Sequence, residues 1–114
     1  AYQCKYEGHT GRNNVQNSVI YVIDAEAGTA MAYDGLIHQT NKVPIPTSFK
    51  VLQPGKYLLT WKLDNIPSKR GNISLTATFT ARVNTGKMSS TIDTRIHRAD
   101  NDIRGSGPCT VLRQ

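Results

Sequence analysis

The clearest pattern in the chain is an alternation of apolar and polar residues from 72 to 97, interrupted once by a short polar segment with a glycine. A period of two is typical of a half-buried β-strand, so the pattern predicts two strands joined by a turn. We expect Asn84 to lie opposite Lys87, a register that brings Phe79 next to Ile92. The predicted inward face of the first strand consists of Ile73, Leu75, Ala77, Phe79, Ala81 and Val83.

Several other segments have the short length and the β-branched or aromatic content of strands, and glycine, proline or polar residues separate them. No segment has the apolar spacing of three to four residues that is typical of an amphipathic helix. Asp34-Gly35 fits a two-residue hairpin turn or a bulge inside one strand that runs on to Thr40, and the resulting strand length favours the bulge. The additional expected strands are residues 1–7, 18–24, 29–33, 47–52, 57–64 and 109–112, and residues 98–107 are expected to form a polar loop.

Eight short strands in succession predict an all-β fold, in which residues 1–114 form a single antiparallel up-and-down β-barrel domain. Closure into a barrel removes the two exposed sheet edges that a flat meander would leave. The alternative is a β-sandwich made of the same strands.

The two cysteines, Cys4 and Cys109, lie near opposite ends of the chain, and each falls on the apolar side of a predicted terminal strand. They could be two buried free thiols or one disulfide, and their matched faces favour a disulfide between the first and last strands. Such a bridge would close the barrel and implies an oxidising compartment, so we expect a secreted or periplasmic protein. The start at Ala1 is expected to be a mature end left by removal of a leader, or an artificial boundary.

The Tyr-x-Cys segment at residues 2–4, the turn at residues 85–88 and the Gly-Ser-Gly-Pro-Cys segment at residues 105–109 resemble small secreted bacterial β-barrel proteins of mostly uncharacterised function. The resemblance concerns structural positions, and it implies a barrel and secretion but no activity. In size, barrel class and cysteine use the chain is also similar to the membrane-bound and periplasmic inhibitors of c-type lysozyme. Their Ser-Gly-x-x-Tyr inhibitory loop has no counterpart here, and the basic charge departs from what a partner of cationic lysozyme should have.

The chain has 14 Lys and Arg against 8 Asp and Glu, a net charge of +6. A positive surface attracts polyanions, although charge of this size can also serve solubility alone. The first hypothesis is therefore a non-enzymatic binding protein whose basic outer surface contacts an anionic macromolecule or a protein partner. The expected register places Arg82 beside Ser89 and Arg95 beside Thr76 on the outer face. The residues expected to carry the contact are Lys69, Arg70, Arg82, Arg95 and Arg98.

The predicted strand at residues 18–24 is apolar on both faces, so its outer side is expected to be covered by a loop or by another copy of the chain. This feature supports another hypothesis, a structural or assembly role. The contact between copies would use either Val19, Tyr21 and Ile23 or Ile20 and Val22.

Candidate catalytic and metal-binding residues are few. The histidines His9, His38 and His97 have none of the short spacings typical of metal sites, and no G-x-S-x-G motif is present. We expect no metal, no cofactor and no membrane span, and the catalytic alternative is a small barrel hydrolase or isomerase acting at a barrel mouth near His38 or Asp34.

The aromatic side chains of Tyr57, Trp61 and Phe79 are expected to fill the core. An eight-stranded barrel has an interior just large enough for side chains or for one small ligand. Small residues leave room for such a ligand at Ala30, Ala32, Ala77 and Ala81.

Overall fold

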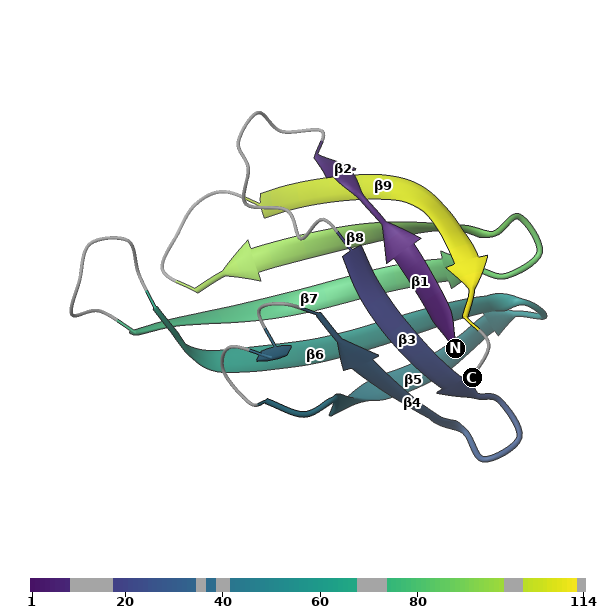
Figure 1. Ribbon diagram of the computed structural model, residues 1–114, viewed down its shortest axis with the longest axis horizontal. Coiled ribbons are helices and arrows are strands. Elements are labelled where there is room, and N and C mark those ends of the chain that lie inside the picture. Colours follow the sequence, from purple (N-terminus) through teal and green to yellow (C-terminus); the bar gives the residue numbers. More distant parts are fainter. Residues whose placement is uncertain (9–17, 35–36, 39–41, 68–73, 98–101, 113–114) are drawn as a thin grey trace.

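The structure is a closed antiparallel β-barrel (Figure 1). In this computed structural model the sheet runs in the order β1-β3-β4-β5-β6-β7-β8-β9, and β9 pairs back with β1. The predicted up-and-down barrel is confirmed, and the closing pair of strands rules out the sandwich. The structure describes residues 1–8, 18–34, 37–38, 42–67, 74–97 and 102–112. Its strands are β1 (Tyr2–Lys5), β2 (Glu7–Gly8), β3 (Ser18–Asp24), β4 (Thr29–Tyr33), β5 (Ile45–Gln53), β6 (Lys56–Pro67), β7 (Ser74–Asn84), β8 (Ser89–Ile96) and β9 (Asp102–Val111).

Strands β1 and β2 are two parts of one barrel strand. Both pair with β9 in one continuous register, with Cys4 opposite Cys109 and Glu7 opposite Ser106. The ladder is interrupted where this register reaches Pro108, which has no backbone N–H to donate. The nine strands therefore make the eight-stranded barrel that the sequence predicts.

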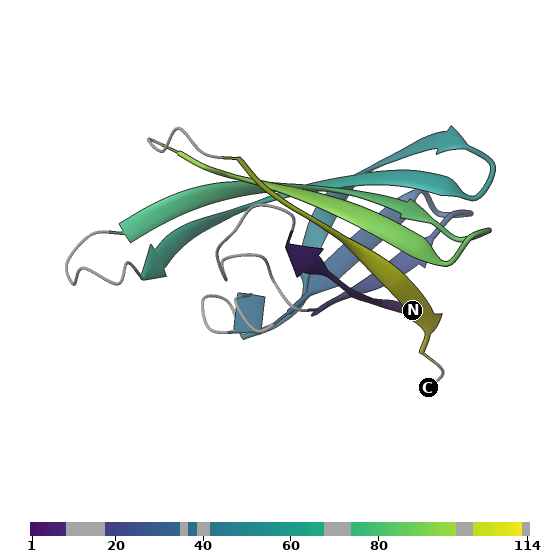
Figure 2. The same ribbon diagram turned by 90° about the horizontal axis from the view of Figure 1, so that it is seen from above.

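A disulfide between Cys4 and Cys109 joins β1 to β9, as predicted. The two residues lie directly opposite each other, and the bridge links positions separated by 105 residues. On the chain-entropy account, a loop of this length stabilises the fold by about 4–5 kcal/mol. The disulfide thus holds the closing seam of the barrel. The two chain ends also meet here, since the Leu112 N–H donates to the Ala1 carbonyl at 2.8 Å (Figures 1 and 2).

The β7–β8 hairpin forms, but the predicted register is wrong by two residues. Asn84 lies opposite Ser89 rather than Lys87, because the turn has four residues and not two. The Lys87 N–H donates to Asn84 Oδ1 at 3.0 Å, and Met88 adopts a left-handed φ of 49°. A shift of two keeps each residue on its predicted face. The corrected pairs are Phe79 with Thr94, Arg82 with Thr91 and Arg95 with Thr78.

The segment after β4 differs from both interpretations of Asp34-Gly35. Strand β4 ends at Tyr33, and Asp34 begins a helical turn instead of a bulge or a two-residue hairpin. The Ile37 N–H donates to Asp34 Oδ1 at 2.7 Å, and the His38 N–H donates to the Asp34 carbonyl at 2.9 Å. This is the capping role for which aspartate is well suited. Gly35 and Thr40 lie outside the described residues.

Strand β9 is longer than expected, since it begins at Asp102. The predicted loop over residues 98–107 is therefore wrong from residue 102 onward, while residues 98–101 lie outside the described part of the chain. Gly105 and Gly107 occupy inward positions of β9, opposite Ile92 and Ser90 of β8. Glycine at these positions removes the apolar alternation by which a strand is recognised in a sequence.

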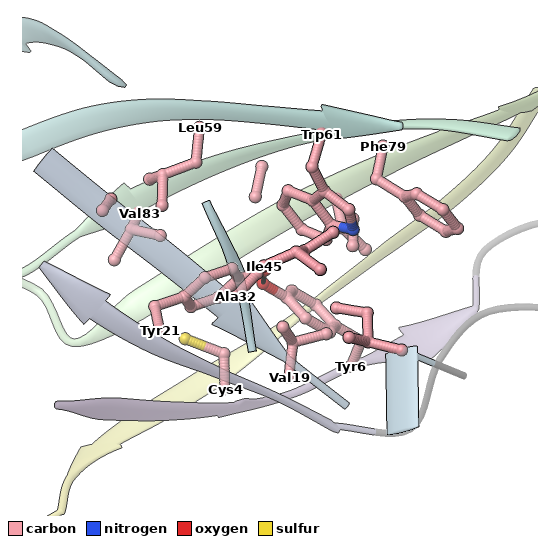
Figure 3. Close-up of a cluster of buried hydrophobic side chains, with 14 of the residues drawn as sticks. Cys4, Tyr6, Val19, Tyr21, Ala32, Ile45, Leu59, Trp61, Phe79 and Val83 are labelled. Carbon is pink, nitrogen blue, oxygen red and sulfur yellow. Dashed lines mark hydrogen bonds between the residues drawn. The ribbon is translucent and has the colours of Figure 1, made fainter. Parts of the chain in front are cut away.

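The core lies inside the barrel, where aromatic rings meet from opposite walls (Figure 3). Trp61 stacks on Phe79 with ring centroids 5.4 Å apart, and Tyr21 meets Trp61 edge-on at 5.8 Å. The predicted core positions of Trp61 and Phe79 are confirmed, and Tyr57 is partly buried against the same cluster. In Figure 2, β6–β9 cover one side of the barrel and β1, β3 and β4 form the other. The predicted small inward residues are all buried, namely Ala30, Ala32, Ala77 and Ala81.

Candidate functional site

The outer side of β5–β9 carries most of the exposed cations that the structure describes on strands. Alternation along each strand sends apolar residues inward and the charged residues outward. We call this surface the basic face. Its described cations are Lys50, Lys56, Lys62, Arg82, Arg95 and Arg104, and the carboxylates described on it are Asp64 and Asp93.

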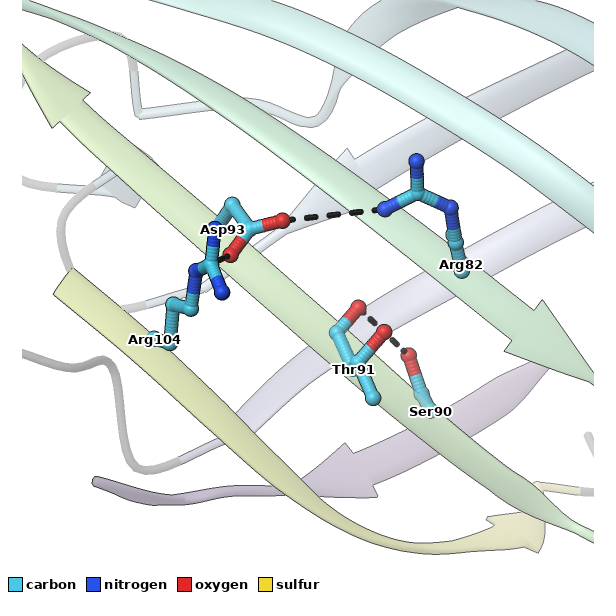
Figure 4. Close-up of polar contacts among 5 residues, drawn as sticks. All are labelled: Arg82, Ser90, Thr91, Asp93 and Arg104. Carbon is cyan, nitrogen blue, oxygen red and sulfur yellow. Dashed lines mark hydrogen bonds and ion pairs between the residues drawn. The ribbon is translucent and has the colours of Figure 1, made fainter. Parts of the chain in front are cut away.

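One of these carboxylates lies between two arginines (Figure 4). Asp93 Oδ2 is 3.6 Å from an Arg82 guanidinium nitrogen, and Asp93 Oδ1 is 3.0 Å from Arg104 Nε. All three side chains are substantially exposed, so each pair contributes at most about 1 kcal/mol. Their effect is mainly positional: one carboxylate orients two guanidinium groups and leaves a net positive charge.

The other cations of the basic face have no described ion pair. Lys62 and Arg95 flank Thr78 across neighbouring strands, and they lie four residues along the sheet from the Arg82 row, which is about 13 Å. Between the charges the surface is rich in hydroxyl groups. One of them, Thr78 Oγ1, is 3.1 Å from His97 Nε2. Cations and hydroxyl donors therefore alternate over several strands.

The structure brings together part of the predicted contact set. Arg82 and Arg95 lie on the basic face, while Lys69, Arg70 and Arg98 lie outside the described residues. The prediction missed cations on three other strands, because it considered charge only within one hairpin and its flanking loops. The missed residues are Lys50, Lys56, Lys62 and Arg104, and strict alternation along β5 and β6 could have identified the three lysines.

The middle of the outer side of β3 and β4 is apolar in contrast. Val22 of β3 is 46% exposed and lies opposite Met31 of β4, which is 38% exposed and lies opposite Pro46. Of the two contact sets predicted for residues 18–24, the one with Val19 and Tyr21 is wrong, because both side chains are fully buried inside the barrel. The outward set of Ile20 and Val22 is the one at the surface.

The residues considered for catalysis make local structural contacts. Asp34 is buried and caps the helical turn through Ile37, while the His38 Nδ1 atom is hydrogen-bonded to the Tyr33 hydroxyl. His9 lies outside the described residues. Within the described part of the chain, no group of three or more His, Cys, Asp or Glu side chains is arranged to hold a metal ion.

Two buried tyrosines form a polar network inside the barrel. The Tyr6 hydroxyl lies 2.7 Å from the Tyr21 hydroxyl and 2.7 Å from Ser90 Oγ. Burial raises the pKa of Tyr6 to about 12, and the hydrogen bonds to Ser90 and Tyr21 only partly offset this. Burial likewise raises the pKa of Tyr21 well above 10.0, with further contributions from Tyr6 and Asp34. Both hydroxyls thus stay protonated at neutral pH and act as hydrogen-bonding groups.

No family model, no curated protein and no solved structure matches this chain. The resemblance to small secreted bacterial barrels therefore stays a prediction. In the described residues there is no helix of the length and apolar character needed to cross a membrane.

Proposed function

We propose that this chain is a non-enzymatic, secreted or periplasmic binding protein whose basic face contacts an anionic macromolecule. The observation that supports this best is the charge balance of that face, where six described cations stand against the carboxylates of Asp64 and Asp93. The disulfide supports the proposed location, since such bridges persist in oxidising compartments.

A single-sign field over one face attracts a polyanion and raises its rate of encounter. The cations sit on paired strands of a closed sheet, so their spacing is fixed before a partner arrives. Such preorganisation lowers the entropy lost when the partner binds. The expected contact is electrostatic and weakens as salt screens the charges, because the screening length is about 8 Å at physiological ionic strength.

The chemistry between the charges favours an acidic polysaccharide over single-stranded nucleic acid. Proteins that bind single strands commonly stack the bases on aromatic side chains. Among the described outward side chains of β5–β9 there is no Phe, Tyr or Trp; threonine and serine stand between the cations instead. Hydroxyl groups can donate to and accept from sugar hydroxyls, while the lysines and arginines pair with sulfate or carboxylate.

The test is the salt concentration at which the protein elutes from a heparin column. In the face variant Lys50, Lys62 and Arg95 are each replaced by Gln. In the control variant Lys5, Lys42 and Lys87, which are exposed away from the sheet surface of the basic face, are replaced by Gln. Both variants carry the same net charge of +3, from +6 less three cations.

We expect the face variant to elute at clearly lower salt than the control variant, and the parent to elute last. Equal elution of the two variants would show that retention follows net charge alone, and the proposal would fail. Early elution of the parent together with both variants would reduce the basic face to a solubility feature.

A second candidate role is self-association through the apolar outer side of β3 and β4. The exposed row of Val22, Met31 and Pro46 favours it, because these three outward residues lie side by side on neighbouring strands and carry no charge. Two copies with a charge of +6 each repel one another least when they meet through this uncharged row. Their basic faces would then point outward, and the pair would bind one long polyanion at two places.

A further inference from the structure

The barrel interior contains polar groups that the fold does not use. Trp61 and Thr94 are 3% and 4% exposed, yet Trp61 Nε1 and Thr94 Oγ1 have no hydrogen-bond partner in the described part of the chain. This contrasts with Tyr6, Tyr21 and Ser90 nearby, whose hydroxyl groups satisfy one another.

Such groups are costly in a folded protein. A buried donor or acceptor without a partner costs about 1–3 kcal/mol, because it has lost its hydrogen bonds to water. Valine would fill the space of Thr94 and phenylalanine much of the space of Trp61 without this cost. The presence of the Trp61 N–H and the Thr94 hydroxyl inside a small barrel is therefore better explained by a bound ligand than by packing.

The two groups lie in one layer of the barrel. Phe79 of β7 lies opposite Trp61 on one side and opposite Thr94 on the other. Their backbones are thus two strand spacings apart, about 10 Å, and both side chains point inward. Figure 3 shows Trp61 and Phe79 entering the interior from one wall and Tyr21 and Tyr6 entering from the opposite wall. This layer combines aromatic rings with two unused hydrogen-bonding groups.

The surroundings restrict the charge of a guest. Asp34 is the one charged side chain among the described residues that is buried. An anionic guest would have to lose its hydration with no described buried cation to compensate, which is strongly unfavourable. Flat aromatic walls favour planar molecules, and the Trp61 N–H requires a hydrogen-bond acceptor.

We propose that the barrel interior binds a small, uncharged, planar molecule of the cyclic-amide or nitrogen-heterocycle class. Trp61 Nε1 donates to its carbonyl oxygen or ring nitrogen, and Thr94 Oγ1 hydrogen-bonds to a second polar atom. Ala32 and Ala81 contribute small inward side chains, and barrels of this size class can hold one small ligand inside. This site is separate from the basic face and does not depend on the function proposed for it.

Trp61 is the single tryptophan of the chain, so its fluorescence reports on the site directly. The probes are 2-pyridone and benzimidazole, with benzoate as a planar anionic control. Binding is followed by Trp61 emission and by titration calorimetry. We expect saturable binding of at least one of the two uncharged probes and a benzoate affinity at least tenfold weaker. No saturable heat or emission change with either uncharged probe at millimolar concentration would overturn the proposal, as would equal binding of benzoate.

Thr94→Val separates a ligand-binding hydroxyl from a structural one, because valine keeps the shape and removes the hydroxyl. Thr80→Val on the outer face of β7 is the matched control. We expect Thr94→Val to weaken probe binding about tenfold and to leave the urea midpoint of the free protein unchanged or higher, while Thr80→Val alters neither. A lower midpoint for Thr94→Val alone would mean that the hydroxyl serves the fold, for example through an internal water, and would overturn its assignment to a ligand.

Discussion

Replacing Gly107 by alanine tests whether the closing seam of the barrel is as tight as the structure indicates. A Cβ at this position would lie 1.7 Å from the Lys5 carbonyl oxygen and 2.9 Å from the Lys5 carbonyl carbon. Neither strand can simply move away, because the disulfide between Cys4 and Cys109 fixes β1 to β9 close by. The backbone must therefore shift locally. The shift removes seam contacts and disturbs the hydrogen bond of 2.7 Å between Tyr6 and Ser90, which passes over β9 at Gly107.

Overpacking of a well-packed site costs about 1–3 kcal/mol, and the strained or lost buried hydrogen bond adds about 1 kcal/mol. We therefore expect Gly107→Ala to lower the free energy of unfolding by about 2–4 kcal/mol. With the urea dependence typical of small domains, the midpoint falls by about 1–2 M. Trp61 fluorescence and far-ultraviolet circular dichroism both follow the transition.

Gly86→Ala is the control for this experiment. An added Cβ there would meet Asn84 Oδ1 at 3.4 Å, an ordinary contact, and a surface change of this kind alters stability by less than about 0.5 kcal/mol. If Gly107→Ala unfolds at the same urea concentration as Gly86→Ala and the parent, the close approach of β9 to β1 is not real.

Two further predictions follow from the buried tyrosines and from the apolar outer row. The folded-state pKa of Tyr6 is about 12, above its unfolded value of 10.0, so its contribution to stability is complete below pH 10 and is lost as the pH rises toward 12. The free energy of unfolding should thus fall in this window by up to about 1.4 kcal/mol per pH unit per tyrosine, and the fall should be shallower for Tyr6→Phe; parallel curves for the two proteins would contradict the assignment. For the second prediction, sedimentation velocity should show self-association of the parent and of a Ser48→Lys control but not of Val22→Lys, and a monomeric parent would refute the contact.

The parts of the fold that could be predicted are those that leave a pattern in the residue types. Strands β3 and β4 were expected with the bounds they have, and the inward positions of β7 from Ala77 to Val83 were expected correctly. Ile73 and the side chain of Leu75, which were predicted on the same face, lie outside the described part of the chain. These features depend on which residues are apolar, and burial sorts such residues directly. The disulfide between Cys4 and Cys109 was predictable for the same reason, because both cysteines lie on inward faces of terminal strands.

Other features depend on single contacts that residue types do not specify. The register of β7 and β8 is fixed by a four-residue turn, in which the Asn84 side chain accepts a hydrogen bond and Met88 takes a left-handed backbone. The helical turn after β4 likewise depends on one carboxylate, that of Asp34, which accepts the Ile37 N–H. A side chain used in this way is compatible with several turn types, so pattern alone does not choose among them.

The start of β9 was missed because its inward positions are Gly105 and Gly107, and Arg104 was assigned to a loop in consequence. One of these glycines, Gly107, also explains how the seam closes. A side chain at Gly107 would collide with Lys5, and its absence lets Tyr6 reach across to Ser90. The glycine at position 107 therefore interrupts the apolar alternation of β9 in the sequence, and the fold requires it there.

The two proposed binding sites use opposite sides of the same strands. On β7 and β8 the cations Arg82 and Arg95 point outward, while Phe79 and Thr94 point inward. Because neighbouring residues of a strand face opposite ways, a charge substitution on the basic face leaves the interior layer intact, and Thr94→Val leaves the outer charges intact. The heparin and probe experiments can therefore fail independently. A protein in which both succeed would bind a polyanion outside and a small neutral molecule inside, and any coupling between the two would have to pass through β7 and β8. Measuring heparin retention with and without saturating 2-pyridone then decides whether the sites communicate, since a ligand shifts a second binding equilibrium only if it binds the two states with different affinity.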